Sequence, residues 1–332
     1  MTVKFTRRRA LTVLAAAAGV PLFLTATRAQ AKMVRWEGTA LGAPASISLY
    51  HKDEAKAHAA IEAGLAELAR LETIFSVYRA DSILASLNRD GRVEKAPKEF
   101  IELLTRALSL AEKSEGIYDP TIQPLWQTYF RHFTSANPDP SGPSLADIDA
   151  ARSLVGWRQV EVNADAGSVA FAKPGMGLTL NSGAQGFITD RVADLLRAHG
   201  FTQTIVDMGE PRALDAKPDG SAWRIGIANP ANPAQAITEI DVVNKCVSTS
   251  GGYGTLFDDA GKFTHLIDPR TGKTAPALLG VSVVAPTATQ ADGLSAALLL
   301  ADAGKRQSLL RAMGGEMALV VTPEGVAQKV EA

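Results

Sequence analysis

Six short segments of this 332-residue chain combine glycine with a carboxylate, a hydroxyl or a histidine, which is unusual for structural scaffold alone. Glycine lets the backbone approach a ligand closely, and amides beside small residues can hold an anionic phosphate. A carboxylate such as Asp292, at the head of a predicted helix, can either cap that helix or bind a hard cation. Each segment alone has an ordinary explanation as a turn, a cap or a polar pair, but six together predict a ligand-lined cleft. The segments are residues 118–121, 181–186, 207–210, 248–252, 265–269 and 291–293.

The common nucleotide and metal motifs are incomplete or missing from the sequence. Residues 271–274 read Thr-Gly-Lys-Thr, but Ile267 stands where a phosphate loop needs its first glycine. Residues 251–254 read Gly-Gly-Tyr-Gly, which does not match the dinucleotide-binding pattern. The sequence has no His-Glu-x-x-His motif, no cysteine–histidine cluster and no Gly-x-Ser-x-Gly elbow. These patterns therefore leave the ligand of the cleft unidentified.

Charge and cysteine content exclude further classes of protein. The chain has 34 Lys and Arg residues against 35 Asp and Glu residues, and no basic run beyond its first residues. Because nucleic-acid binding needs a concentrated positive face, we expect no nucleic-acid partner, DNA included. The single cysteine, Cys246, cannot form a disulfide within its own chain, so stability must come from burial.

The first 31 residues have the features of an export signal. Arg7 and Arg8 precede a short apolar, alanine-rich stretch over residues 10–24, and small residues at 29–31 suit a signal peptidase. The alternative is an uncleaved anchor, although the stretch is short for a membrane span. We expect a twin-arginine signal over residues 1–31, a periplasmic location, and one domain over residues 32–332.

Periodicity in the remaining chain indicates helices packed on strands. Apolar residues recur at spacings of three and four over residues 55–75, and Pro97 begins a second helix. Further helices are predicted over residues 190–199 and 291–303, with a strand pair over 34–50 turning at Gly42. We expect an α+β fold with an antiparallel sheet. The other predicted strands are residues 160–162, 178–180, 204–207, 223–227, 237–243, 279–284 and 317–322, the last of them closing the sheet.

From about residue 36 to the last strand, the sequence resembles the ApbE family of FAD:protein FMN transferases. The resemblance implies a T-fold-like core with an antiparallel sheet and packed helices. The sequence of residues 184–190 and 123–126 is most similar to the exported branch associated with nitrous-oxide reductase maturation, the NosX type. The matching segments are residues 38–42, 75–78, 81–82, 87–88, 116–121, 124–125, 184–187, 190, 209–210, 212–213, 223–227, 249–251, 265–272, 285–286 and 291–292.

The resemblance also implies a reaction and a site. Such enzymes split FAD and join its FMN half to a threonine or serine hydroxyl of a partner protein, releasing AMP, with magnesium screening the pyrophosphate charge. Asp292 and the main-chain oxygen of Ala184 would hold the metal, and His265 would accept the hydroxyl proton. Tyr78 would stack on the flavin. The remaining residues implied for FAD binding are Leu41, Asp119, Gln185, Glu210, Ser250 and Asp268.

Three of these roles have simpler alternatives, and one position departs from the family. Asp292 can be a helix N-cap alone, His265 a core histidine, and Tyr78 plain core packing. Ala296 stands where the family carries a threonine whose hydroxyl also reaches the metal, and it has no ligand atom. Ser295 is adjacent but lies about 100° away around a helix, so it is a poor substitute.

These departures leave other functions open. Gln185 stands where the family often has a lysine, and Pro211 where it has an isoleucine. The alternative function is therefore an FAD- or FMN-binding maturation or carrier protein without transferase activity. An exported interaction subunit with an empty cleft is a third class. The sequence Ser182-Gly183-Ala184 resembles part of the acceptor motif of these enzymes, but the family match already explains it. In the branch that the chain resembles, the acceptor would be an exported domain of a membrane flavoprotein (NosR-like) that supplies electrons to nitrous-oxide reductase.

Overall fold

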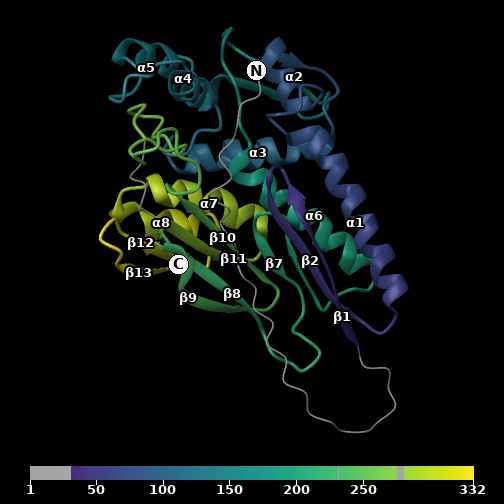
Figure 1. Ribbon diagram of the computed structural model, residues 1–332. Helices are drawn as coiled ribbons and strands as arrows, with labels where there is room; N and C mark the ends of the chain where they lie inside the picture. Colours follow the sequence, from purple (N-terminus) through teal and green to yellow (C-terminus); the bar gives the residue numbers. More distant parts are fainter. Residues whose placement is uncertain (1–30, 231, 275–279) are drawn as a thin grey trace.

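A computed structural model describes residues 31–230, 232–274 and 280–332, and its centre is an antiparallel sheet of eight strands (Figure 1). Every neighbouring pair in this sheet runs antiparallel, and the order is β1-β2-β6-β7-β10-β11-β12-β13. Among the described residues, no further strand pairs with the outer edge of β1 or of β13. The strands are β1 Lys32–Ala40, β2 Ala43–His51, β6 Thr204–Asp207, β7 Pro211–Ala213, β10 Lys245–Gly251, β11 Gly280–Ala285, β12 Met317–Val321 and β13 Ala327–Glu331.

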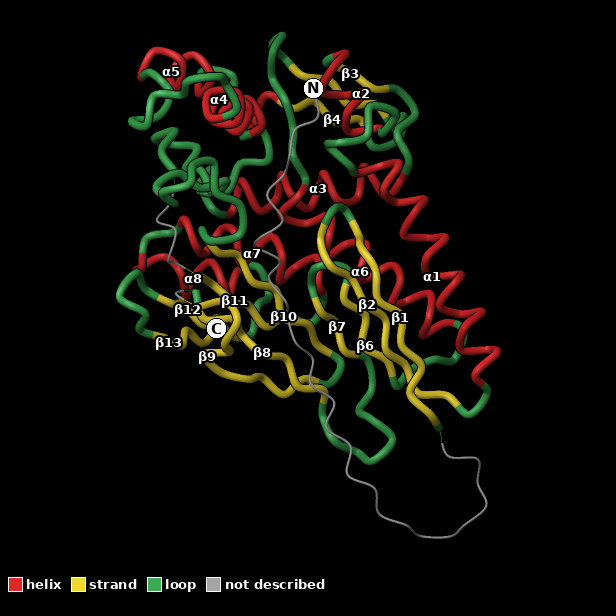
Figure 2. The backbone as a smooth tube through the Cα atoms, in the orientation of Figure 1, coloured by secondary structure: helices red, strands yellow, loops and turns green. Residues whose placement is uncertain are grey.

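Helices cover one face of this sheet. The helices α1 (Glu54–Phe75), α6 (Asn181–Ala198) and α7 (Ala288–Leu300) pack on the strands, and α3 (Lys98–Lys113) crosses α6 and α7 on their far side (Figures 1 and 2). Below α7 in Figure 1 lies α8 (Ala303–Ala312). The apolar faces of these helices and of the sheet form the main core, which confirms the predicted α+β class.

A separate two-stranded ribbon covers the opposite face of the sheet. It consists of β8 (Trp223–Asn229) and β9 (Asn232–Val242), which pair with each other. Buried Trp223, Ile225 and Ile227 pack on Val247 and other sheet residues in a second, smaller core. The central strands are therefore shielded from water on both faces.

A group of smaller elements lies beyond α3, at the top of Figure 1. A three-stranded sheet, β3 (Arg92–Val93), β5 (Ser168–Phe171) and β4 (Val160–Asn163), sits with α2 (Ile83–Asp90). The helices α4 (Gln123–Phe133) and α5 (Leu145–Arg152) form the other corner, with the loop of residues 252–274 directly below α4. An aromatic cluster that includes Tyr129, Phe257 and Phe263 joins α4 to this loop.

Several predicted boundaries and one element are wrong. Residues 178–180 are not a strand, because the amide and carbonyl of Leu178 bond to the side chain of Asn88, at 2.7 and 2.8 Å. Helix α6 begins at Asn181 instead of 190, and α7 spans Ala288–Leu300 instead of 291–303. The strand over 317–322 is not the last, since β13 follows it. Within the described residues, no helix has the length and apolarity needed to cross a membrane, and the predicted signal falls almost wholly outside them.

Candidate functional site

Asp292 is a buried carboxylate in the second turn of α7, with only 4% of its surface exposed. One of its oxygens accepts the backbone N–H of Gly186 at 3.1 Å, and the amide of Gly183 also donates to the carboxylate. Burial raises the pKa of Asp292, and the two amides oppose that rise. Thr287, not Asp292, is the N-cap of α7, because its side chain accepts from the amide of Gln290. Asp292 is therefore not the N-cap of its own helix, and its bonds to backbone amides are made with the start of α6.

A break near the start of α6 aims the two amides at Asp292. Ser182 (φ −84°, ψ 61°) has a non-helical backbone, as has Gly183, and the regular helix resumes at Ala184, which is fully buried. A Cβ atom on Gly186 would lie 2.3 Å from the carbonyl oxygen of Ala288. Only glycine permits this backbone-to-backbone contact between α6 and α7. The contact brings the turn that contains Ala184 next to Asp292, as the sequence predicts.

Asp190 locks the same two helices together. Its carboxylate accepts the backbone N–H groups of Ala288 and Thr289, both at 2.9 Å, and the hydroxyl of Thr289 at 2.6 Å. It also pairs with the buried guanidinium of Arg212 at 2.8 Å. A negative group at a helix N-terminus satisfies donors that have no partner within the helix. Sequence reasoning included Asp190 and Arg212 among the family matches but assigned neither this role.

Glu210 lies beside the Asp292 carboxylate, and Gln185 lies against Gly209, the residue before Glu210. Burial and the nearby charges of Asp292 and Asp207 raise the pKa of Glu210, which accepts hydrogen bonds from the Ser248 side chain and the Thr249 amide. The side chain of Gln185 lies across Gly209, since a Cβ on that glycine would be 2.6 Å from the amide nitrogen of Gln185. Three residues predicted from separate segments, Asp292, Glu210 and Gln185, thus converge here.

A chain of hydroxyl groups joins α7 to β10. The Ser295 hydroxyl is fully buried and donates to the carbonyl oxygen of Asp292 at 2.9 Å. It also lies 2.7 Å from the hydroxyl of Ser250 and 3.3 Å from that of Ser248. The Ser295 hydroxyl therefore already bonds to β10 and to the main chain of α7. This agrees with the expectation that it is a poor substitute for a metal-binding threonine at position 296. Ala296, the neighbouring position, is buried.

A cavity of about 540 Å³ begins next to Asp292, between α3 and the N-terminal ends of α6 and α7. Ser182, Gly183 and Gly293 line it on the side of Asp292. Tyr118 also lines it, and burial together with the charges of Asp292 and Asp119 raises the pKa of its phenol. The α3 wall carries apolar Leu103 and Leu110 with cationic Arg106 and Lys113. The lining suits a ligand with both an apolar part and negative charge.

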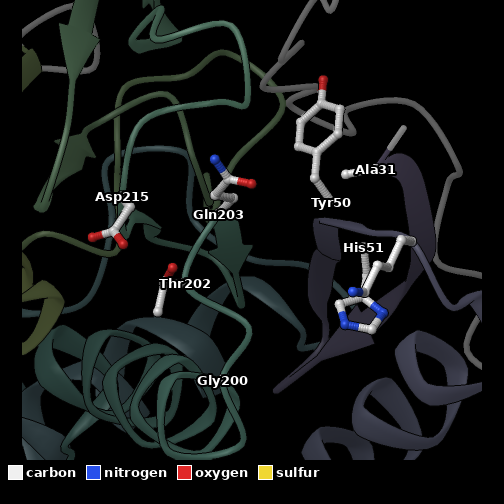
Figure 3. Close-up of a pocket in the computed structure, with 8 residues that line it drawn as sticks. Ala31, Tyr50, His51, Gly200, Thr202, Gln203 and Asp215 are labelled. Carbon is white, nitrogen blue, oxygen red and sulfur yellow. The ribbon is translucent and has the colours of Figure 1, made fainter. Parts of the chain in front are cut away.

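A second hollow, of about 320 Å³, lies at the opposite end of the sheet (Figure 3). Tyr50, His51 and Asp215 are among its lining residues, and their side chains stand apart around an open space. None of the predicted site residues is among the residues that line it. None of them lines the first cavity either, but its lining residues Gly183 and Gly293 are chain neighbours of Ala184 and Asp292, so that cavity is the one adjacent to the predicted site.

His265 lies on the loop of residues 252–274 and is partly exposed. Its Nδ1 atom is 3.0 Å from the carbonyl oxygen of Thr255, and its amide donates to the same oxygen at 3.0 Å. Its other ring nitrogen, Nε2, has no hydrogen-bond partner among the described residues. Burial lowers the pKa of His265, so the imidazole is neutral near pH 7 and can accept a proton. The choice between a proton acceptor and a core histidine stays a prediction, because the ring is only partly exposed and its surroundings are buried enough to lower its pKa.

Two predicted ligand residues use their carboxylates within the fold. Asp119 accepts the amide and hydroxyl of Thr121, at 2.9 and 2.6 Å, and the amide of Trp157 at 3.0 Å. Asp268 accepts the amide and guanidinium of Arg270 in a turn. Both side chains shape loops near the site, and their predicted contacts with a nucleotide remain predictions.

Leu41 and Tyr78 each lie near the C-terminal end of α1. Leu41 forms the turn between β1 and β2, and its amide donates to Glu72 of α1 at 2.8 Å. Tyr78 follows α1 and is 69% exposed. The alternative that Tyr78 is ordinary core packing is therefore wrong, and its ring is available to a ligand.

Comparison with known proteins identifies the family. The family model described as "ApbE family" matches residues 41–321, most of the chain. The chain belongs to the ApbE family. It is 32% identical over 311 residues to the FAD:protein FMN transferase of Treponema pallidum, covering 86% of this chain and 83% of that protein. The corresponding protein of Klebsiella pneumoniae is 28% identical over 295 residues, with the same coverage of both chains.

Solved ApbE structures agree with this assignment. The apo form of the Pseudomonas stutzeri flavinyl transferase ApbE superposes with a TM-score of 0.77 at 28% identity, over 91% of this chain and 95% of that one. The Thermotoga maritima ApbE protein gives a TM-score of 0.79 at 25% identity, over 90% and 97%. The predicted fold and the predicted ApbE enzyme class are thus confirmed. The narrower NosX-type placement stays a prediction.

The residues around Asp292 in this ApbE-family protein fit a hard cation. A buried carboxylate with a raised pKa is stabilised in its charged form by a cation, and carboxylate and main-chain oxygens are the ligands that Mg²⁺ prefers. No group of three or more His, Cys, Asp or Glu side chains among the described residues is arranged for a metal. A cation beside Asp292 would therefore take most of its ligands from main-chain oxygens, water and substrate phosphate, which magnesium accepts readily.

Proposed function

We propose that this ApbE-family chain transfers FMN from FAD to a threonine or serine hydroxyl of an exported acceptor protein, with release of AMP. The observation that carries the proposal is the buried Asp292 carboxylate, held between the break in α6 and the second turn of α7, beside a 540 Å³ cavity. The relatives from Treponema pallidum and Klebsiella pneumoniae described above are named for this activity. Magnesium, bound by Asp292 and the main-chain oxygen of Ala184, would screen the charge of the pyrophosphate.

The reaction requires one proton acceptor and one leaving group. The acceptor hydroxyl oxygen bonds to the phosphorus of the FMN half, and the bond from that phosphorus to the bridging oxygen breaks, leaving its electron pair on AMP. The hydroxyl proton passes to Nε2 of His265, which is neutral and without a partner in the described structure. Tyr78, exposed at the end of α1, offers its ring to the flavin.

A flavin-binding carrier or maturation factor without transferase activity is the alternative. The observation in its favour is Ala296, which is buried and offers no oxygen where the family pattern has a threonine. Ser295 cannot replace that oxygen, because its hydroxyl is bonded to Ser250 and to the Asp292 carbonyl. Since magnesium commonly keeps several waters, one more water would fill the vacancy, with weaker metal affinity and slower transfer.

The setting of the reaction is also part of the proposal. The arginine pair and apolar stretch at the N-terminus support export by the twin-arginine route to the periplasm. The acceptor would then be an exported domain of a membrane electron-transfer flavoprotein. The resemblance of residues 123–126 and 184–190 to the NosX type supports a NosR-like acceptor and a role in electron supply to nitrous-oxide reductase.

The test is a transfer assay with residues 32–332, FAD, Mg²⁺ and a candidate acceptor domain. Covalent FMN on the acceptor is measured by mass and AMP by chromatography, with Asp292→Asn alongside. We expect magnesium-dependent transfer that falls at least a hundredfold in the variant, because one charged ligand is removed. Tight FAD binding without transfer to any acceptor tried would instead establish the carrier function.

A further inference from the structure

The α4 helix exposes a stacked aromatic pair on its surface. The rings of Trp126 and Phe130 are 5.0 Å apart and inclined by only 13°, and Phe130 is 40% exposed. Large hydrophobic side chains exposed to this extent are few in the described structure, and Leu145 at the start of neighbouring α5 is another. Aromatic side chains that lie together at a solvent-exposed surface are enriched at protein interfaces. Trp126, Phe130 and Arg131 are called the α4 surface below.

The α4 surface is continuous with the loop that carries His265. Trp126 contacts Phe257 of that loop edge-to-face, with ring centroids 5.7 Å apart, and the Tyr129 hydroxyl donates to the carbonyl oxygen of Gly272 at 2.8 Å. Within the loop, Leu256 pairs with Thr264, directly before His265. Figures 1 and 2 show the loop lying between α4 and α7. A continuous series of contacts therefore connects the α4 surface to His265.

Two cationic side chains lie next to the aromatic pair, and the nearby carboxylate of Asp258 is already bonded to the amides of Lys262 and Phe263. Arg131 follows Phe130 on α4, and its guanidinium makes no ion pair within the part of the chain that the structure describes. Lys262 of the loop lies over the ring of Phe263, 5.1 Å from its centroid; its backbone amide donates to Asp258, but its ammonium group forms no ion pair among those residues. An acidic side chain on a partner would complement these cations.

We propose that the α4 surface docks the acceptor protein, which places an apolar side chain on the Trp126–Phe130 pair and an acidic one near Arg131. The inference rests on the proposed function, because that reaction requires a protein to bring its hydroxyl to His265. A cavity can hold FAD, but a protein partner needs a contact area of at least several hundred Å² outside it. Aromatic and arginine side chains contribute most to such interfaces, and here both occur beside the proposed base.

The experiment separates docking from chemistry by using two forms of one acceptor domain. The first form keeps its acceptor threonine and reports transfer; the second carries valine there and reports binding alone, by biolayer interferometry. We expect Phe130→Ala to weaken binding and raise the KM for the acceptor about tenfold, with kcat and FAD affinity within twofold. Arg131→Glu should weaken binding by a similar factor and reduce its dependence on salt.

Met33→Ala is the matched control, because Met33 has the same 40% exposure but lies on the edge strand β1. Thermal unfolding verifies that each variant is folded. Acceptor binding and KM that do not change in either Phe130→Ala or Arg131→Glu would overturn the docking proposal. An acceptor that binds through the α4 surface but is never modified would support docking and contradict the proposed transfer.

Discussion

The two halves of the site are held together by different forces. Around Asp292, the helices α6 and α7 meet backbone to backbone at Gly186, and the Asp190 carboxylate and buried Arg212 lock them. Around His265, aromatic rings of α4 pack on a loop, and polar contacts are mostly exposed. The first arrangement has a single geometry, because buried polar groups must keep their partners. The second tolerates local movement, which suits a surface that meets a protein.

Removing Arg212 is the most direct way to test the first half. Arg212→Met should lower the free energy of unfolding by about 3–5 kcal/mol, because it leaves the buried Asp190 charge without its cation. Arg270→Met, which breaks the exposed pair with Asp268 beside His265, should cost less than about 1 kcal/mol. Urea denaturation of both variants measures the difference. Equal losses would show that the two regions do not differ in this way.

His265 tests the second half. His265→Gln should reduce the transfer rate about 10²- to 10⁴-fold while FAD affinity stays within twofold, because only the proton acceptor is removed. In the wild type, the rate should fall as pH decreases through the pKa of His265, which burial places below the ordinary histidine value. The variant should show no such step. A step that persists in the variant would assign the proton to another group.

Two serine hydroxyls that bond to opposite faces of β10, Ser295 and Ser282, allow a finer comparison. Ser295→Ala should cost about 1 kcal/mol of stability and weaken FAD binding, because Ser250 loses its 2.7 Å partner. Ser282→Ala removes an equivalent bond, 2.8 Å from Thr249, on the opposite side of β10. It should cost similar stability without affecting FAD binding. Isothermal titration with FAD distinguishes the two, and a similar affinity loss in both would exclude a specific role for Ser295.

A further prediction concerns the pH dependence of stability at the end of β6. Burial raises the pKa of Asp207 from 3.8 to about 6. The folded chain therefore holds this proton more tightly than the unfolded chain, and the resulting stability is complete below pH 4 and is lost as pH rises through 6. Asp207→Asn should leave the Tm nearly unchanged at pH 4 and raise it at pH 7. For exposed Asp219, whose pKa is lowered by hydrogen bonds from Ser221, the Asn variant should not be stabilised at pH 7.

Local patterns in the sequence predicted the elements that depend on interactions between neighbouring residues. The helix over residues 55–75 was evident because its apolar side chains recur on one face, and α1 has nearly the same bounds. Family motifs located the segments of the site, and Asp292, Gln185 and Glu210 do converge. By contrast, the start of α6 was not predicted. The non-helical backbone at Ser182 interrupts the helix, so residues 181–186 do not show a helical pattern in the sequence.

Contacts between distant residues could not be predicted from spacing. The bond from Tyr129 to Gly272 joins residues 143 positions apart, and that from Asp190 to Ala288 joins residues 98 apart. Neither residue type indicates its partner, since each has an ordinary local alternative. The failed strand at 178–180 has the same cause, because Asn88, 90 positions away, takes the backbone groups that a strand partner would need.

The two open edges of the central sheet have a consequence for the solubility of the chain. An edge strand presents unpaired backbone groups to which a strand of another molecule can add. Both edges here carry ion-paired charges along their exposed side, Arg35 with Glu37 on β1 and Lys329 with Glu331 on β13. Another strand could pair there only by burying these charges. These paired charges therefore oppose edge-to-edge addition at a sheet that stays unclosed among the described residues.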